Sequence, residues 1–175
     1  GLVSSAFGLS ATPVDIDQDG WLDIYVANDF IEPDNVFFNN RDGTFTDHFF
    51  DYFKHTSHFS MGTDATDFNN DGLVDIIVVD MKSGDHVRYK ELAKPMQYDK
   101  YNLMVQYGYG RQPGRNMLQL NCGNNTFIDI GQFAGVSATD WSWTPLMADF
   151  NNDGWKDIYI TNGYRRDVTD LDYTN

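Results

Sequence analysis

The chain has 175 residues and a formal net charge of −14, a size that suits one domain with its own hydrophobic core. The chain has no cluster of basic residues that could bind phosphates, so we expect no nucleic-acid partner. No apolar run approaches the ~20 residues of a membrane span, so we expect no transmembrane segment in this chain. Cys122 is the only cysteine, which excludes an internal disulfide, and an aromatic content of 15% favours β structure.

The first predicted elements are two strands around an acidic loop. Residues 10–14 (SATPV) and 24–27 (IYVA) have strand-type composition, and DIDQDGWLD, Asp15–Asp23, lies between them. Like charges this close repel by ~1 kcal/mol per pair even in water, so a turn that gathers four aspartates needs a cation. The hairpin NVFFNNRDGTFTD, Asn35–Asp47, then supplies two further strands around an Asn/Gly turn.

The same order of elements returns twice. Strands at 62–66 and 76–79 flank DFNNDGLVD, Asp67–Asp75, and a hairpin at 116–129 follows. Strands at 144–148 and 158–161 flank DFNNDGWKD, Asp149–Asp157. Three copies of D-x-[DN]-x-D-G-x-x-D with identical spacing indicate an internal repeat.

The spacing of the loops locates an insertion. The first two loops start 52 residues apart and the last two 82 apart, whereas the hairpin residues Phe45 and Phe127 both lie 22 residues before the next loop. One repeat of about 52 residues therefore carries about 30 extra residues, at roughly 82–115. Four antiparallel strands per repeat predict an all-β fold, a partial β-propeller of about three four-stranded blades with one mixed helix/loop insertion in the second blade.

We expect residues 1–175 to form one propeller segment. Blade 1 is predicted at about 1–47, blade 2 at about 48–137, and an incomplete blade 3 at about 138–175. Propellers close with 4–8 blades, so we expect the remaining blades to come from other segments of a larger protein.

The insertion has a different character from the repeats. Pro95 is placed to open a helix, and apolar residues at helical spacing predict that helix over about 96–106, followed by a Gly-rich loop. Five tyrosines gather here: Tyr89, Tyr98, Tyr101, Tyr107 and Tyr109. They are interpreted either as wedges that pack the helix on the blade edge or as an aromatic ligand-contact surface.

The acidic loops have the chemistry of calcium cages, since calcium takes 6–8 oxygen ligands in flexible geometry. Positions 1, 3 and 5 offer side-chain oxygens, the glycine at position 6 permits the sharp bend, position 7 offers its carbonyl and the aspartate at position 9 closes the cage. Up to three calcium ions are predicted, on Asp15, Asp17, Asp19, Trp21 and Asp23; on Asp67, Asn69, Asp71, Leu73 and Asp75; and on Asp149, Asn151, Asp153, Trp155 and Asp157.

Two alternatives compete with these cages. An EF-hand begins in the same way, but it needs a bidentate Glu at position 12, where this chain has Val26, Val78 and Ile160 inside strand-type runs. The loops are otherwise Asp/Asn turns that hold no metal. The matched spacing of three copies favours metal over that alternative.

The sequence contains no recognised catalytic motif, and we expect no enzyme activity. His55 and His58 are three residues apart, but no acidic or cysteine partner at a known spacing completes a zinc site. Neither a G-x-S-x-G elbow nor a P-loop is present. A glycosidase pair remains an open alternative, because carboxylates are plentiful.

The loops and the strands that follow them resemble the FG-GAP/VCBS repeats of integrin-type β-propellers. Phe7, Gly8, Ala11 and Pro13 before the first loop resemble the Phe-Gly and Gly-Ala-Pro signature of those repeats. The N-x-F-x-N and G-T-F-x-D hairpins and DWSWTPLMADFNNDGWKDIYITNGYRRDVTD are similar to bacterial proteins of the ASPIC/UnbV, cartilage-acidic-protein-like family. The resemblance covers nearly the whole chain. It implies a calcium-binding propeller that is extracellular or on the cell surface, with an outer-membrane association in bacterial members, and with metal ligands at the loop positions given above.

Two functions are therefore expected from the sequence. The first is a non-catalytic, calcium-binding propeller segment that mediates protein or ligand binding and adhesion. The second is a carbohydrate-binding or polysaccharide-active module, motivated by Trp141, Trp143 and the tyrosine-rich insertion, since sugars stack on aromatic faces.

Overall fold

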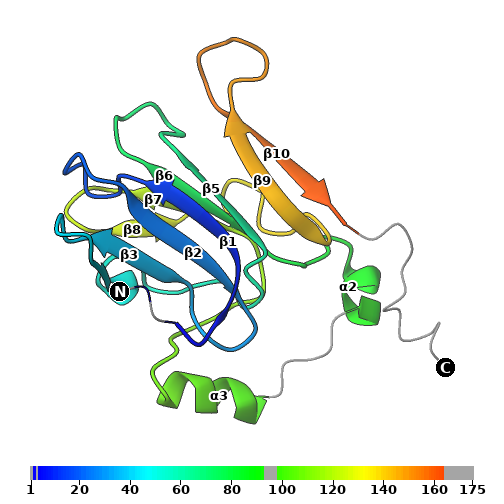
Figure 1. The fold of residues 1–175 in the computed structure, drawn as a ribbon. Coiled ribbons are helices and arrows are strands. Elements are labelled where there is room, and N and C mark those ends of the chain that lie inside the picture. The colour runs from blue at the N-terminus through cyan, green and yellow to red at the C-terminus, as the bar shows by residue number, and fades with distance from the viewer. Residues whose placement is uncertain (1, 3, 93–97, 164–175) are drawn as a thin grey trace.

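The computed structural model describes residues 2, 4–92 and 98–163, which form three antiparallel sheets side by side (Figure 1). We call these sheets blades 1, 2 and 3. Blade 1 contains β1 (Phe7–Val14), β2 (Asp23–Asp29), β3 (Asn35–Asn39) and β4 (Phe45–Asp47). Blade 2 contains β5 (Gly62–Thr66), β6 (Asp75–Val79), β7 (Met117–Asn121) and β8 (Phe127–Asp129). Blade 3 contains β9 (Ser142–Ala148) and β10 (Asp157–Asn162).

The sequence repeat is also a repeat of strand register. In each blade the residue just before the acidic loop pairs with the aspartate at loop position 9: Val14 with Asp23, Thr66 with Asp75, and Ala148 with Asp157. Each loop therefore closes the hairpin of the two inner strands at the same point.

The hydrophobic core lies between the blades, because side chains alternate across each strand and both sheet faces of blade 2 are covered. The joint between blades 1 and 2 is the larger cluster and includes Ile16, Tyr25, Val36, Phe38, Phe49, Phe53, Ile76, Val78, Met117 and Phe127. The joint between blades 2 and 3 gathers Ile77, Leu118 and Met147, with Phe68, Ile130, Val136, Ile158 and Ile160 packed against them. Face-to-face sheets with inter-sheet cores confirm the predicted all-β, partial-propeller fold.

The inner strands of the three blades lie beside one another, with β5 in contact with both β1 and β9. The backbones of β5 and β9 approach closely at Gly62, where an added Cβ would lie 2.2 Å from the carbonyl oxygen of Trp143. Only glycine fits at that point of β5. The strand that the sequence predicts as the start of blade 2 thus touches blade 3 through its backbone.

Three short helices complete the described chain: α1 (Phe49–Tyr52), α2 (His86–Leu92) and α3 (Tyr98–Gln106). The predicted helix at 96–106 corresponds to α3, whereas Pro95 and Met96 lie outside the described residues. Helices α1 and α2 were not predicted, because neither short segment shows a helical apolar period. The part of the predicted, incomplete blade 3 that follows Gly163 also lies outside the described residues.

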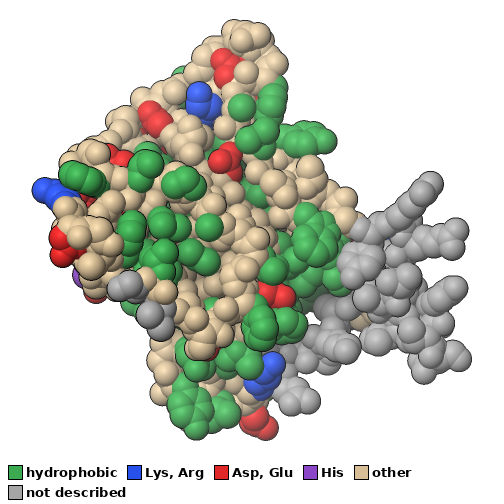
Figure 2. Space-filling view, in the orientation of Figure 1, with side chains coloured by type: hydrophobic (Ala, Val, Ile, Leu, Met, Phe, Trp, Pro, Cys, Tyr) green, Lys and Arg blue, Asp and Glu red, His purple; other side chains and the backbone are tan. Residues whose placement is uncertain are grey.

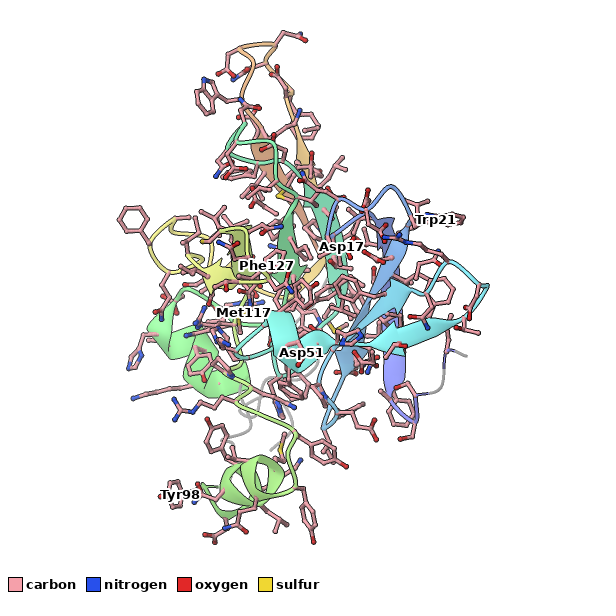
Figure 3. All side chains as sticks on the ribbon, turned by 90° about the vertical axis from the view of Figure 1, so that its left-hand side faces the viewer. Asp17, Trp21, Asp51, Tyr98, Met117 and Phe127 are labelled. Atoms are coloured by element: carbon pink, nitrogen blue, oxygen red, sulfur yellow. The ribbon has the colours of Figure 1, made fainter. Side chains whose placement is uncertain are left out.

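The tyrosines of the insertion differ in exposure. Tyr98 and Tyr107 are largely exposed, whereas Tyr101 and Tyr109 are half-buried, and the buried side chain of α3 is Met104. Figure 3 shows Tyr98 pointing away from the sheets, far from the first acidic loop with Asp17 and Trp21. The insertion therefore presents aromatic side chains to solvent at the end of the molecule opposite that loop.

Candidate functional site: three acidic loops

The three acidic loops share one backbone conformation. Position 4 is left-handed in every copy, with φ of 60° at Gln18, 61° at Asn70 and 62° at Asn152. The position-6 glycine follows with φ of 88°, 86° and 91°, at Gly20, Gly72 and Gly154. Glycine adopts this region without steric cost, which explains its place in the motif.

The position-1 carboxylate holds each loop together. Asp15 accepts the N–H of Asp19 at 3.0 Å and the N–H of Gly20 at 2.9 Å. Asp67 and Asp149 make the same pair of bonds, at 3.0 and 2.9 Å and at 3.1 and 2.9 Å. The first aspartate is therefore part of the turn itself and is already oriented before any cation arrives.

In loop 1 the first three aspartates converge. One carboxylate oxygen each from Asp15, Asp17 and Asp19 lies within 4.8 Å of the others. Clustered carboxylate oxygens on a tight turn are the donor set that calcium prefers, so the side chains fit that ion. This cluster lies at the rim of the molecule, where an ion can enter.

Loops 2 and 3 have an amide where loop 1 has its second carboxylate. Asn69 Nδ2 donates to Asp71 at 2.9 Å, and Asn151 Nδ2 donates to Asp153 at 3.0 Å. Position 3 thus offers one neutral carbonyl oxygen in these loops. Loop 1 carries one more negative charge among its first five residues than either of the others.

The position-9 aspartates make hydrogen bonds that the motif did not predict. Asp23 is buried and accepts two backbone N–H groups, from Ile16 at 3.0 Å and from Asn39 at 2.9 Å. Asp75 does the same with Phe68 and Asn121, both at 2.9 Å. These two carboxylates bridge the loop to the third strand of their own blade. Asp157 accepts Phe150 N–H at 3.2 Å and is only half-buried.

At position 7 the side chains of Trp21 and Trp155 are exposed and that of Leu73 is half-buried, while their N–H groups each donate to the position-5 aspartate at 2.8 Å. An apolar residue is tolerated here because only its backbone contributes to the turn. This placement is compatible with the predicted role of position 7, which is to offer its backbone carbonyl oxygen to the ion.

The loop carboxylates differ in electrostatic environment. Burial raises the pKa of Asp17, and the neighbouring charges of Asp19 and Asp15 raise it further. The hydrogen bond from Arg41 holds the pKa of Asp19 below its usual value. A cation placed between these groups would relieve the repulsion that Asp17 experiences.

Arg41 is a residue of the site that the motif did not indicate. It lies in the β3–β4 turn, and its Nε donates to Asp19 Oδ2 at 2.9 Å while a terminal guanidinium nitrogen contacts the same oxygen. The equivalent position in blade 2 is Gly123, so blade 2 has no such contact. Its signal in the sequence is only a basic residue in a turn, which is common on surfaces.

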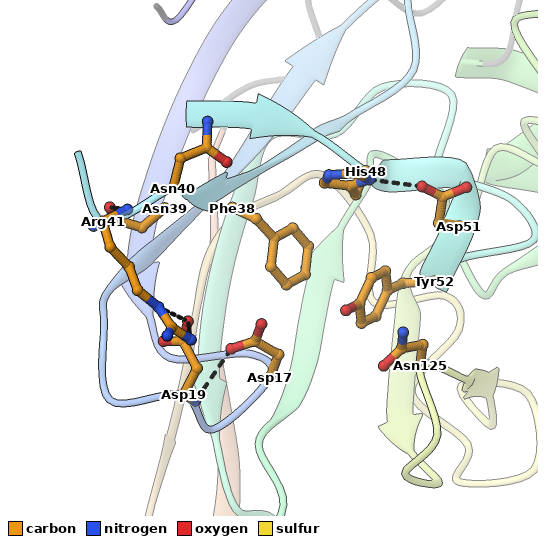
Figure 4. A pocket seen from close by; sticks show the side chains of 10 residues that line it. All are labelled: Asp17, Asp19, Phe38, Asn39, Asn40, Arg41, His48, Asp51, Tyr52 and Asn125. Carbon is orange, nitrogen blue, oxygen red and sulfur yellow. Dashed lines mark hydrogen bonds and ion pairs between the residues drawn. The ribbon is translucent and has the colours of Figure 1, made fainter. Parts of the chain in front are cut away.

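An open cleft of about 500 Å³ adjoins loop 1 (Figure 4). Asp17 and Arg41 form one wall, His48 and Asp51 the opposite wall, and Tyr52 stacks on Phe38 at a centroid distance of 4.6 Å. Asn125, from the β7–β8 turn of blade 2, also faces the cleft. The cleft therefore spans the joint between two blades beside the predicted metal.

The histidines of the 55–58 pair serve separate contacts. His55 Nε2 lies 3.2 Å from Asp129, which Arg115 also contacts at 2.6 Å. Although burial raises the pKa of Asp129, hydrogen bonds from His55, Gly131 and Arg115 lower it to about 2. His58 instead contacts Gln112 at 3.2 Å and helps to anchor the end of the insertion. The structure does not bring the two rings to a common ligand.

Comparison with known proteins agrees with the repeat. The family profile described as FG-GAP-like repeat matches residues 15–83 and 104–160, well over half of the chain, and its segments contain all three acidic loops. A search of curated proteins finds no significant match. None of the helices in the described ranges is long and apolar enough to cross a membrane. The repeated loops, the sheets they close and this match together place the chain in the FG-GAP-like repeat family.

Proposed function

We propose that this chain is a non-catalytic, calcium-stabilised β-propeller segment that binds a protein or another ligand outside the cell or at its surface. The convergence of three carboxylate oxygens at Asp15, Asp17 and Asp19 is the observation that carries the calcium part. FG-GAP repeats bind calcium in general and are typical of extracellular proteins, which supports both parts. The similarity of the quoted segments to ASPIC/UnbV proteins favours that branch of the family.

Bound calcium would mainly raise the stability of the folded state. Each loop is a hairpin turn between two inner strands, and a ligand that binds only the folded loop stabilises it by about 2.7 kcal/mol at 100 times its dissociation constant. Asp15, Asp17 and Asp19 would hold the ion in loop 1, Asp67, Asn69 and Asp71 in loop 2, and Asp149, Asn151 and Asp153 in loop 3. Position 7 would contribute its backbone carbonyl oxygen, and the aspartate at position 9 would close each cage in addition to its hydrogen bonds within the blade.

The test is calorimetric titration of calcium into the chelator-stripped chain, combined with thermal melts. We expect three sites and a melting temperature that rises on loading. Asp19→Ala, Asp71→Ala and Asp153→Ala should each remove one site. Their effect on the fold itself should be small, because these carboxylates, unlike Asp23 and Asp75, do not bridge the loop to the third strand of a blade. Asp99→Asn, an exposed acid on α3, is the matched control. Binding heat that is absent, or unchanged in all three variants, would refute calcium binding by the loops.

A second candidate is carbohydrate binding, which the exposed aromatics favour. Tyr98 and Tyr107 on the insertion and the partly exposed Trp143 on β9 present ring surface to solvent. Trp141 is a weaker candidate because its indole nitrogen is buried. A glycan array and a polysaccharide hydrolysis screen test it, with Trp143→Ala and Tyr98→Ala as variants and Phe133→Ala as the control. Signal on neither assay would remove this candidate.

A further inference from the structure

The three acidic loops lie along one edge of the molecule, where Figure 2 shows acidic side chains at the surface. A side chain at position 4 connects each of the first two loops to the next. Gln18 of loop 1 donates through Nε2 to the carbonyl oxygen of Gly72 in loop 2. Asn70 of loop 2 donates through Nδ2 to the carbonyl oxygen of Gly154 in loop 3 at 2.9 Å. Both bonds therefore run from position 4 of one loop to position 6 of the next.

The donor of the first bond is fixed in the middle of a predicted ligand set. Gln18 lies between Asp17 and Asp19, and its backbone is left-handed, with φ of 60°. The N–H of Asp19, the next residue, donates to Asp15 at 3.0 Å and to Asp17 at 3.2 Å. The direction of the Gln18 side chain is thus set by the same turn that gathers the three carboxylates of loop 1.

The acceptor of this bond is connected to a predicted ligand of loop 2. The Gly72 carbonyl and the Leu73 N–H belong to one peptide group, and the N–H donates to Asp71 at 2.8 Å. Gln18 therefore holds one side of this peptide group, while Asp71 accepts a hydrogen bond from the other side. Two successive hydrogen bonds lead in this way from position 4 of loop 1 to the position-5 carboxylate of loop 2.

Loops 2 and 3 repeat this arrangement. The peptide group between Gly154 and Trp155 accepts the hydrogen bond from Asn70, and it donates its N–H to Asp153 at 2.8 Å. Loop 2 therefore takes part in both connections, as the acceptor from loop 1 and as the donor to loop 3.

Each connection is complete only when both of its loops are ordered. Gln18 must be in its left-handed turn, and the peptide group of Gly72 must be held by Asp71. A cation bound by one loop favours the ordered turn of that loop, which makes the hydrogen bond available to the neighbouring loop. The neighbour then forms this bond when its own turn becomes ordered, so cation binding in the two loops is linked. The free energy of one hydrogen bond corresponds to roughly a two- to tenfold change in affinity.

We propose that Gln18 and Asn70 are positioning residues that couple the calcium sites of neighbouring loops, so that an occupied site strengthens binding at the next. We call the sites of loops 1, 2 and 3 site 1, site 2 and site 3. The coupling rests on the proposed function, because it needs ions in the loops. It adds that the segment responds to calcium as a linked series and not as three independent sites. Site 2 should be affected most, since loop 2 makes both connections.

The experiment measures whether site 2 responds to the loading of site 1. The chelator-stripped, ¹⁵N-labelled chain is titrated with calcium at fixed ionic strength, and the amide signals of Gly20, Gly72 and Gly154 report the occupancy of their own loops. The affinity of site 2 is compared between the parent chain and Asp19→Ala, which should lack site 1. We expect site 2 to bind calcium roughly two- to tenfold more weakly in Asp19→Ala.

Variants at position 4 test the route of the coupling. Gln18→Gly removes the donor while glycine keeps the left-handed backbone, so the effect of Asp19→Ala on site 2 should disappear. Gln18→Asn should restore it, since Asn70 makes the equivalent bond with an asparagine. Asn152→Gly is the matched control: it makes the same change in loop 3, where the Asn152 side chain has no hydrogen-bond partner among the described residues. This control should leave the coupling of sites 1 and 2 intact.

The second connection is tested in the same way. Asn70→Gly should remove the effect of Asp153→Ala on site 2, whereas it should leave the effect of Asp19→Ala in place. Repulsion between ions in neighbouring loops is common to the parent and the glycine variants, so it cancels in these comparisons. Thermal melts of each variant in chelator confirm that it is folded.

Two results overturn the coupling while leaving calcium binding in place. One is a site 2 affinity that is the same in the parent and in Asp19→Ala. The other is an effect of Asp19→Ala that persists unchanged in Gln18→Gly, because another route would then connect the sites. A chain that binds no calcium refutes the proposed function together with the coupling, so the two failures are distinguishable.

Discussion

The carboxylate of Asp23 accepts the backbone N–H of Asn39 at 2.9 Å, and this bond ties the end of the first acidic loop to the third strand of its blade. The other oxygen of Asp23 accepts Ile16 N–H at the start of the same loop. A residue that the motif places in a metal cage is therefore also a buried structural bridge.

Replacing Asp23 should destabilise the fold even without metal. Asp23→Ala leaves two buried N–H groups unpaired, which should lower the free energy of unfolding by about 2–4 kcal/mol. Among the described residues, Asp157→Ala removes one bond of 3.2 Å at a half-buried site, and it should cost less than about 1 kcal/mol. Urea unfolding of both variants in chelator measures the difference. Equal losses would contradict the bridging role of Asp23.

Removing Arg41 should strengthen calcium binding at loop 1. Its guanidinium occupies an oxygen of Asp19 that an ion would also use, so Arg41→Gln should tighten binding roughly two- to fivefold, as expected for loss of one partly screened charge. The titration is made in a chain with Asp71→Ala and Asp153→Ala, where loop 1 alone remains. Lys90→Gln on α2 is the control for the change of net charge. Weaker binding in Arg41→Gln would show that Arg41 organises the loop.

Asp34 should make stability depend on pH. Burial raises its pKa to about 6, despite hydrogen bonds from Asn28, Thr56, Tyr25 and Ser60. The folded state therefore holds the proton more tightly than the unfolded chain does. This contribution is fully present below about pH 4 and is lost as the pH rises through about 6; its full size is roughly 3 kcal/mol.

Blade 2 indicates the substitution that tests this. Asn116 occupies the position equivalent to Asp34, and its side-chain oxygen accepts the N–H of Asp80 as Asp34 accepts that of Asn28. Asp34→Asn should match the parent protein near pH 4 and exceed its free energy of unfolding by roughly 1–3 kcal/mol at pH 7. Urea unfolding in chelator from pH 4 to pH 8 measures the difference. A variant that is less stable at pH 7 would refute this assignment.

The joint between blades 1 and 2 should depend strongly on Phe53. This ring is fully buried and stacks on Phe127 at 4.3 Å and on Phe49 at 5.1 Å. Phe53→Ala should lower the free energy of unfolding by about 3–5 kcal/mol through the cavity it leaves. Phe133→Ala, at an exposed site, should change it by less than about 0.5 kcal/mol. A similar effect of both changes in denaturant unfolding would mean that the joint contributes little.

The strands could be predicted because their signals are local. Each acidic loop fixes a hairpin at its own position, and the paired residues Val14 and Asp23 recur as Thr66 and Asp75. Alternating apolar residues then assign the faces. The left-handed glycine at position 6 was likewise predictable, since no other residue adopts that backbone as cheaply.

The long-range contacts could not be predicted in the same way. Arg41 reaches Asp19 across 22 residues, and Gln18 reaches Gly72 across 54. Nothing in the neighbourhood of either donor signals its partner, because the first contact depends on how the turns of one blade lie together and the second on how two blades pack. The double role of Asp23 was missed for the same reason, since its second acceptor bond belongs to β3.

The connection between β6 and β7 separates two regions of the molecule. The acidic loops lie at the end of the sheets where the inner hairpins turn, whereas α2 and α3 extend from the opposite end (Figure 1). Residues such as Tyr98 can therefore be exchanged, or the insertion lengthened, without changing any side chain of the three acidic loops. If the loops bind calcium as proposed, one calcium-stabilised frame would present different surfaces to its partners, and a change of partner would not alter the stability of the fold.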